Sequence, residues 1–505
     1  MRLLFSSIAL LAMFSPVFAV LEIPNTQPKV HANEWKWVLD STWQGLKRRN
    51  IDAYSTGLVH RPKSETPNDA VSEGIGYGML LALYANDQTY FDKIFNAGKQ
   101  YNLSYCKNWH WPYRNQSDGG SATDADEDIA LALIFAAKLV EKGKWQASSI
   151  NYENDAQSAV NCVWGSMRGG QLCPGNGWCP GFNLGYFAPA WYRIFGSFSN
   201  NPSHDWQQAV NASYALIESS SSYDIGMVPD WNGGGGYNNY LDGDAFFKDA
   251  IRVLWRIAND AIWFGEERAK TFLSNALSFI NSKGGPSAAN FYQIQGQNKG
   301  ELVPANDIWA QFNDETNQNT WRYRQEHSHL TVGQWLTAAM AVGTNEEKIA
   351  WSNEMAKFYD FGNRVSFFGN AVDPTGGIED TLHNEMYFDQ FLAWFGVSLM
   401  SGTWVNVVEL LDNPVENSEG IPGAPASVKS LKPAKLGIQI SQSRGLIQMR
   451  SQSNVTWKIH NLQGKLLFSS SSRETSWNAG GFKGAIAVSA TTELSNSERK
   501  LLVIR

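Results

Sequence analysis

Apolar residues recur with a spacing near 3.6 from about Glu34 to Val405, which predicts helices over almost all of that stretch. Loops rich in Gly, Asn, Pro and Asp separate them, and we count about a dozen helices. Clear examples are Gly74–Tyr84, Asp128–Val140, Phe246–Phe264, Leu330–Val342 and Met386–Met400.

Some of these helices are apolar on nearly every face, as in Ile129–Ala137. Helices of this kind are usually enclosed by other parts of the protein. Many helices in one domain, some of them wholly buried, therefore predict two concentric rings. No repeat of roughly 34 or 40 residues indicates a solenoid instead.

The pattern changes near Leu410, where prolines with Gly, Ser and Asn between them predict a linker over residues 410–434. Residues 435–505 then alternate between apolar and polar positions, with glycines at the turns. This period of two predicts a small antiparallel β-sandwich. We therefore expect an all-α domain over residues 20–409, followed by a small all-β domain over residues 435–505.

The first 19 residues have the features of a secretory signal peptide. Arg2 supplies the positive start, Leu3–Phe18 the apolar stretch and Val17–Ala19 a small-residue cleavage site. The apolar stretch is too short to span a membrane comfortably, so we expect cleavage after Ala19 and a secreted protein. No other segment has the composition of a transmembrane helix.

Export places the four cysteines in an oxidising compartment, where three pairings are open to them. We expect Cys173 to pair with Cys179 across a short turn, and Cys106 to pair with Cys162. A zinc site is the alternative, but the two nearest cysteines have no flanking pair of histidines.

Composition and charge narrow the choice of partners. The 505 residues include 21 Trp, which mostly pack in cores but also suit a groove whose rings stack on sugars. From Lys435 onward the chain has ten Lys or Arg and three Asp or Glu, a net charge of about +7. Because the whole chain carries −7, the residues before Lys435 carry about −14. An acidic helical domain argues against nucleic acid or another anionic polymer as the substrate.

Glu73 is the first of three acidic settings that suit catalysis. It begins an apolar helix within the glycine-rich stretch Ser72–Met79. Partial burial would raise its pKa, as a general acid requires. The structural alternative is a carboxylate that simply favours the helix dipole.

The second setting is Ala122–Ala130, which places four acidic residues directly before a buried helix. Capping of that helix by Thr123 or Asp124 is the structural alternative. An EF-hand is excluded because Ile129 stands where the calcium loop needs glycine. Acids that open a buried helix must be bonded, either to neighbouring side chains or to sugar hydroxyls.

The third setting is Asp249 at a predicted helix start, with Arg252 and Arg256 following on one face. A ladder of ion pairs, Asp249–Arg252 and Arg256–Asp260, is the structural alternative. A carboxylate kept ionised by arginine is also what a general base needs. No serine-hydrolase elbow, H-E-x-x-H motif or nucleotide-binding fingerprint offers a rival chemistry.

At these three segments the chain resembles glycoside hydrolase family 8, the bacterial β-1,4-endoglucanases, xylanases and chitosanases. The family signature Ala-(Ser/Thr)-Asp-(Ala/Gly)-Asp before an apolar helix is complete at Ala122–Ala130, and Ser72–Met79 is equally characteristic. The resemblance spans about Glu34 to Val405. It implies an (α/α)6 barrel and a neutral polysaccharide substrate, and we expect no metal and no other cofactor.

The resemblance also implies roles. Glu73 would be the proton donor, Asp249 the catalytic base, and Asp124 the residue that holds and helps distort the sugar. The family inverts the anomeric centre, which needs carboxyl groups about 6.5–9.5 Å apart to admit a water. Leu254 departs from the proline of many members but touches neither acid nor base. The candidate sugar-binding residues are Tyr77, Asp126, Trp109, Trp111, Tyr186 and Arg252.

The C-terminal part resembles the sorting domains of proteins exported by the type IX route, in Val455–Leu467 and Lys500–Arg505. This implies attachment to the outer surface of a bacterial cell. A carbohydrate-binding module is the alternative, which the few aromatic residues of this part disfavour.

Together these features predict a monomeric, secreted, inverting endo-β-1,4-glucanase that acts on cellulose or mixed-linkage β-glucan. An endo-xylanase or reducing-end oligoxylanase with the same carboxylates is the alternative. A non-catalytic glycan-binding surface protein is the alternative of another class. The joint presence of Glu73, Asp124 and Asp249 argues against it, because a pure binder does not need all three.

Overall fold

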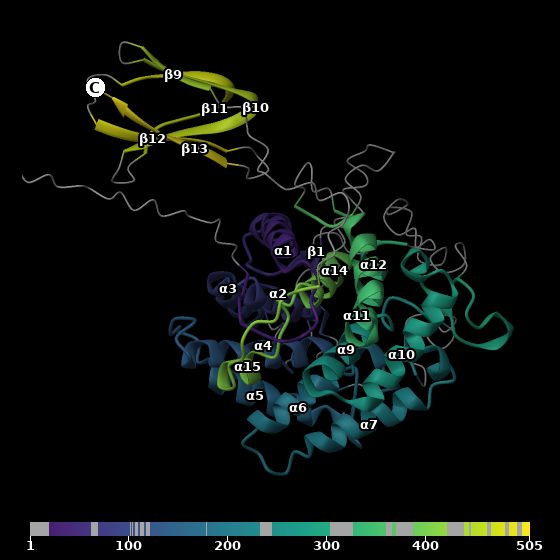
Figure 1. The fold of residues 1–505 in the computed structure, drawn as a ribbon. Coiled ribbons are helices and arrows are strands. Elements are labelled where there is room, and N and C mark those ends of the chain that lie inside the picture. Colours follow the sequence, from purple (N-terminus) through teal and green to yellow (C-terminus); the bar gives the residue numbers. More distant parts are fainter. Residues whose placement is uncertain are drawn as a thin grey trace, which may run out of the picture. The chain divides into compact units, whose positions relative to one another are not determined.

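A computed structural model describes the chain in two compact units (Figure 1). The larger unit is Met1–Tyr359 with Phe367–Pro425, and its described residues are mainly helical. The smaller unit is Asp360–Ser366 with Ala426–Arg505, and its described residues from Gln439 onward lie mainly in strands. The residues described are 20–61, 69–101, 103, 105–106, 110–111, 116–117, 122–177, 179–232, 245–303, 327–359, 366–369, 387–421, 439–443, 446–461, 466–479, 484–491 and 497–504.

Six helices form an inner ring in the helical unit, and each contacts the next so that the ring closes from α14 back to α2. Most of them are buried on almost every face, as their apolar patterns predict. They are α2 (Ser72–Tyr84), α4 (Thr123–Glu141), α6 (Pro189–Phe198), α9 (Arg252–Phe264), α11 (His329–Val342) and α14 (Tyr387–Met400).

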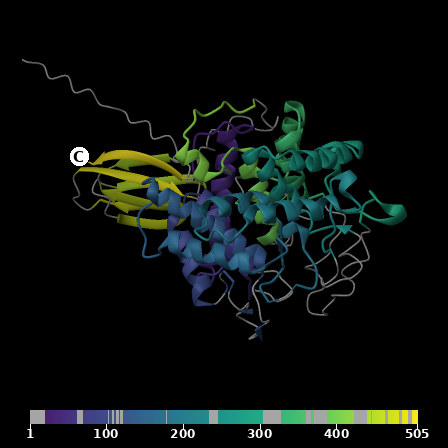
Figure 2. The same cartoon turned by 90° about the horizontal axis from the view of Figure 1, so that it is seen from below.

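A second ring of helices alternates in sequence with the first and packs outside it (Figure 1; Figure 2 gives the view from below). These helices are amphipathic; α3, for example, buries Phe91, Ile94 and Phe95 and turns its other face outward. The two rings confirm the predicted (α/α)6 barrel. The outer helices are α1 (Ala32–Leu46, continued by the π-helical turn Lys47–Asp52), α3 (Gln88–Gln100), α5 (Tyr152–Gly165), α7 (Trp206–Glu218), α10 (Glu267–Ser282) and α12 (Asn345–Ala356).

Short elements connect the helices at their ends. The antiparallel strand pairs are β1 (His60–Arg61) with β2 (Asp69–Ala70), β3 (His110–Trp111) with β4 (Gln116–Ser117), β5 (Met167–Arg168) with β6 (Gln171–Leu172), and β7 (Ala245–Phe246) with β8 (Tyr292–Gln293). The 3-10 turns are η2 (Leu184–Tyr186), η3 (Tyr223–Ile225), η4 (Gly285–Ala288) and η5 (Gly296–Asn298). Across the part of the chain that the structure describes, no helix is both long and apolar enough to cross a membrane.

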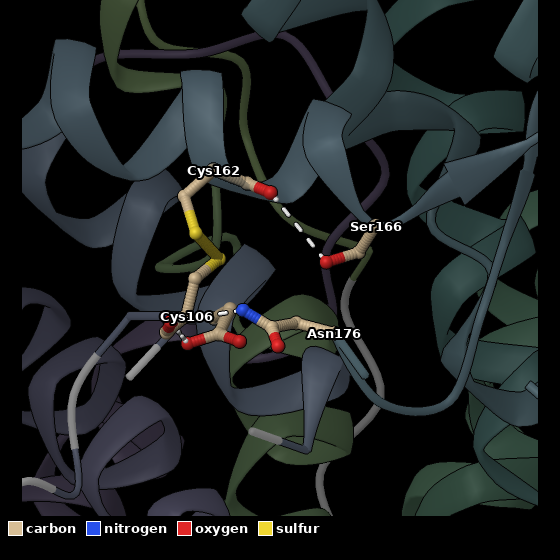
Figure 3. The surroundings of a disulfide bond; sticks show 5 residues. Cys106, Cys162, Ser166 and Asn176 are labelled. Atoms are coloured by element: carbon tan, nitrogen blue, oxygen red, sulfur yellow. Dashed lines mark hydrogen bonds between the residues drawn. A yellow bond between two sulfur atoms is a disulfide. The ribbon is translucent and has the colours of Figure 1, made fainter. Parts of the chain in front are cut away.

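Both predicted disulfides are present, Cys106–Cys162 and Cys173–Cys179. The first joins the chain before α4 to helix α5 (Figure 3). The amide of Asn176 donates to the carbonyl oxygen of Cys106 at 2.9 Å, so the turn closed by the second disulfide supports the first.

The prediction that a linker begins at residue 410 is wrong. Helix α15 (Val407–Asp412) runs through that position, and the chain beyond it stays bonded to the helical unit. Ile421 pairs with Val30 in a parallel bridge, and the ammonium of the buried Lys29 lies 2.6 Å from Asn417 Oδ1. Residues 413–421 are therefore an extended segment fixed by hydrogen bonds, and the rest of the predicted linker, 422–434, lies outside the described residues.

The smaller unit confirms the predicted small β domain. Its five antiparallel strands hydrogen bond into one sheet, in the order β11-β10-β12-β13, with β9 paired to the first part of β10. Alternate side chains of β10, including Ile447, Met449, Trp457 and Ile459, form its buried core. The strands are β9 (Gln439–Ser443), β10 (Leu446–Asn461), β11 (Leu466–Asn478), β12 (Gly484–Thr491) and β13 (Ser497–Ile504).

Candidate active site

Glu73 lies in the first turn of α2, and its side chain is 19% exposed. Glycine brings this turn close to α4, because a Cβ on Gly76 would lie 3.0 Å from the carbonyl oxygen of Ala125. The glycine-rich sequence around Glu73 thus lets two helices approach with Glu73 and Asp124 at their adjoining starts.

Asp124 is almost completely buried at the start of α4. Its Oδ1 accepts from the N–H of the next residue, Ala125, at 2.9 Å. The N-cap position is Ala122, which has no side-chain cap, so the proposed capping by Thr123 or Asp124 does not occur. The carboxylate of Asp124 is instead directed to an arginine.

That arginine is Arg252, and it brings the three predicted acids together. Its Nη1 donates to Glu73 Oε2 at 2.9 Å and to Asp124 Oδ2 at 3.0 Å, and its Nη2 donates to Asp249 Oδ1 at 2.6 Å. The Arg252 side chain is 1% exposed. It was predicted to contact sugar, but its guanidinium is engaged by these carboxylates, whose charge it balances in part.

The guanidinium also limits the separation of the acid and the base. Its two terminal nitrogens lie about 2.3 Å apart, given planar geometry and C–N bonds of about 1.33 Å. Hydrogen bonds of 2.9 and 2.6 Å on those nitrogens hold Glu73 Oε2 and Asp249 Oδ1 within about 7.8 Å of each other.

The three acids differ in how far they are buried. Burial raises the pKa of Glu73 to about 7; Arg252 opposes this rise, the charge of Asp124 adds to it, and a hydrogen bond from Tyr387 opposes it. Burial also raises the pKa of Asp124, against the charge of Arg252. Asp249 leaves 39% of its side chain exposed and is the most open of the three to water.

Two partners of these acids were missed by the sequence reasoning. Tyr387, the first residue of α14, donates its hydroxyl to Glu73 Oε1. The indole N–H of Trp231 donates to Asp249 Oδ2 at 3.1 Å. Tyr387 opens a helix that was predicted, and Trp231 precedes the glycines at 233–236, but neither position alone indicates its partner.

The predicted sugar-binding residues fall in different places. The ring of Tyr186 lies at the site, with the Arg252 guanidinium 4.8 Å from its centroid. Tyr77 is fully buried against Phe395, so the structure does not support direct sugar contact by this ring. The same holds for Asp126, which is 1% exposed and accepts from the N–H of Cys106.

Two further predicted sugar-binding residues cannot be placed as side chains. Trp109 lies outside the described residues, and Trp111 is described only as part of β3.

A second ion pair ties α9 to α4 one helical turn further along. The fully buried Arg256 donates to both carboxylate oxygens of Asp128, at 2.5 and 2.9 Å. The ladder considered from the sequence is therefore half right. Asp249–Arg252 forms, but Asp260 pairs with Arg193 at 2.7 Å and not with Arg256.

Comparisons with known proteins agree on one family. Residues 30–297 match the model of Glycosyl hydrolases family 8. The chain is 35% identical to Endoglucanase 2 of Ruminiclostridium josui over 272 residues, which cover 51% of this chain and 58% of that one. It is 34% identical to Endoglucanase C of Ruminiclostridium cellulolyticum over 346 residues, which cover 66% and 68%. The chain thus spans somewhat more than half the length of the first of these relatives.

Solved structures show the same fold. A β-1,3-1,4-glucanase from Paenibacillus sp. X4, in its apo form, superposes with a TM-score of 0.56 at 22% identity, over 77% of this chain and 97% of that one. The family model covers more than half of the chain and includes Glu73, Asp124 and Asp249. The chain therefore belongs to glycosyl hydrolase family 8.

Proposed function

We propose that this protein is an inverting endo-β-1,4-glucanase that hydrolyses cellulose or mixed-linkage β-glucan. The observation that carries the proposal is the set of three carboxylates on one buried guanidinium, with Glu73 raised in pKa and Asp249 open to water. Hydrolysis needs one carboxyl group that holds a proton and one that can accept a proton at the same pH.

In the proposed reaction, protonated Glu73 donates to the glycosidic oxygen as its bond to the anomeric carbon breaks. A water molecule forms the new bond to that carbon and loses a proton to Asp249, so the configuration is inverted. The upper limit of about 7.8 Å between Glu73 Oε2 and Asp249 Oδ1 leaves room for a separation of about 6.5–7.8 Å, the lower end of the range expected for inverting pairs. The sugar-holding role of Asp124 rests on the resemblance to the family alone, because its carboxylate is 2% exposed and accepts from Arg252 and from the N–H of Ala125.

The choice of a β-glucan rests on the relatives and on charge. Proteins named endoglucanases are 34–35% identical to this chain, and the acidic helical part disfavours anionic polymers. Xylan is the second candidate, because a reducing-end xylose-releasing exo-oligoxylanase of Paenibacillus barcinonensis is 27% identical over 304 residues. A non-catalytic glycan binder is disfavoured because it gains nothing from a Glu73 poised to exchange a proton near neutral pH.

Secretion and retention at the outer cell surface complete the proposal, with the protein acting as a monomer. The signal-like residues 1–19, two disulfides and a basic C-terminal part support it. Fractionation of cells that express the full chain, compared with a chain lacking residues 435–505, tests the attachment. An unchanged surface fraction in the shortened chain would contradict it.

Reducing-sugar release from hydroxyethylcellulose, mixed-linkage β-glucan, xylan and chitosan tests the activity. We expect cleavage of the β-glucans, loss of activity in Glu73→Gln, and normal activity in the control Glu354→Gln, a partly buried glutamate paired with His327 and Lys357. Proton NMR of the first products should show the α-anomer. Folded protein that cleaves none of these glycans would refute the proposal, and a β-anomer would refute inversion.

A further inference from the structure

The turn that carries Asp249 is fixed by the buried carboxylate of Asp230, which is 6% exposed. Asp230 Oδ1 accepts from the backbone N–H groups of Phe247 and Ala250, both at 2.9 Å. These donors lie on either side of Asp249, so one side-chain oxygen fixes the backbone both before and after it. Asp230 therefore sets the backbone from which the Asp249 side chain projects.

The residue after Asp230 holds the Asp249 carboxylate itself. The indole of Trp231 is 7% exposed and donates to Asp249 Oδ2 at 3.1 Å, whereas Arg252 donates to Oδ1 at 2.6 Å. Each oxygen thus receives one donor from a different direction. The Trp231 bond opposes rotation of the carboxylate into a bidentate pair with the arginine, which would engage both oxygens.

The loop that carries Asp230 and Trp231, and the turn Phe247–Ala250 that carries Asp249, are themselves anchored. Asn232 and Phe182 exchange two backbone hydrogen bonds of 2.8 Å each. On the other side of the turn, a Cβ on Gly185 would lie 2.0 Å from the carbonyl oxygen of Asp249, so only glycine permits η2 to pack there. The carboxylate is therefore held by groups whose own positions are constrained.

We propose that Asp230 and Trp231 are positioning residues for the catalytic base, Asp230 through the turn and Trp231 through the orientation of the carboxylate. The proposal rests on the function above, in which Asp249 accepts a proton from water.

Titratable and charged groups approach Asp249 from several elements. They are Arg252 on α9, Glu73 on α2, Asp230 in the loop, Tyr186 in η2, and the Lys248–Asp389 pair between the turn and α14. None of these is changed when Trp231 is replaced. A shift in pH dependence in such a variant would therefore report the indole bond itself.

The test is Trp231→Phe, which keeps an aromatic ring and removes the N–H. Loss of one donor to an ionised carboxylate should lower kcat about tenfold, leave KM within about twofold, and move the acidic limb of kcat/KM up by about half to one pH unit. The matched control is Trp145→Phe, which loses an indole bond of 2.8 Å to Asn86 and should keep the acidic limb of the parent.

A second variant, Asp230→Asn, keeps the Oδ1 acceptor but replaces Oδ2, which lies 3.5 Å from the backbone nitrogen of Asp249, by an amide donor that opposes that N–H. We expect lower kcat with thermal unfolding close to that of the parent and with cello-oligosaccharide binding retained. A parent-like acidic limb and kcat in both variants would overturn the positioning role. Asp249→Asn separates a failure of the proposed function from a failure of the positioning role. An active Asp249→Asn enzyme would overturn the assignment of the base and, with it, this inference.

Discussion

The hydrogen bond from Tyr387 to Glu73 should set the pH at which activity is lost on the alkaline side. Tyr387 is 5% exposed, and its hydroxyl donates to Glu73 Oε1. This bond favours the ionised form of Glu73 and so opposes the rise of its pKa to about 7. Tyr387→Phe removes the donor and keeps the ring, so the pKa of Glu73 should rise further.

The size of the shift follows from the difference between two hydrogen bonds. A bond to a charged group contributes about 1.5–3 kcal/mol, and a bond to a neutral carboxyl group contributes about 0.5–1.5 kcal/mol. Removal of the hydroxyl therefore disfavours the ionised form by about 1–1.5 kcal/mol more than the protonated form. At about 1.36 kcal/mol for each pKa unit, the alkaline limb should move up by about one pH unit.

The assay is kcat/KM on soluble mixed-linkage β-glucan from mildly acidic to alkaline pH. The control is Tyr90→Phe, which loses a hydroxyl bond to the carboxylate of Asp52 on the outer ring and should keep the parent profile. A Tyr387→Phe profile whose alkaline limb stays in place, or moves to lower pH, would refute the reasoning. A lower kcat without this shift would point to substrate contact by Tyr387 instead.

Two further predictions concern buried charge. Arg252→Met leaves Glu73, Asp124 and Asp249 without their common cation, so it should lower the free energy of unfolding by about 3–5 kcal/mol. Urea unfolding followed by Trp fluorescence measures this loss, and unchanged stability would contradict the ion-pair account. Glu127 is fully buried, and burial raises its pKa well above its usual range. Above about pH 4.3 the unfolded chain releases this proton while the folded protein still holds it, so the stability of the parent falls as pH rises. Glu127→Gln should therefore gain in melting temperature relative to the parent as pH increases, and a gain that is independent of pH would refute this assignment.

The inner ring was predictable because a buried helix must carry apolar residues around its whole circumference, and outer helices such as α3 and α10 because one of their faces is apolar. Gly74–Tyr84 was predicted and Ser72–Tyr84 is observed, with the same end. The predicted start of one helix was wrong, because backbone N–H groups expected inside that helix bind groups distant in the chain. The helix expected from Phe246 begins at Arg252, because Phe246 pairs with Tyr292 in β7 and β8 and the next N–H groups are bound by Asp230.

The acids of the site were predictable from residue type and from their places at helix starts, but their partners were not. Tyr387 lies 314 residues from Glu73 in the chain, and only closure of the inner ring brings α14 beside α2. Sequence also does not show which side chains of a motif are buried in the protein. Tyr77 and Asp126 belong to the same stretches as the acids, yet both side chains are buried.

The arrangement also explains why the three similar acids can take different roles. All three bond to Arg252, so this shared cation alone cannot distinguish them. Their exposures are 2% for Asp124, 19% for Glu73 and 39% for Asp249. Because desolvation disfavours a charged carboxylate and solvent favours it, burial keeps a proton on Glu73 near neutral pH while Asp249 remains accessible to water. Exposure therefore separates Asp249, the proposed base, from Glu73, the proposed acid. It does not separate Asp124 from Glu73, because burial raises the pKa of both carboxyl groups.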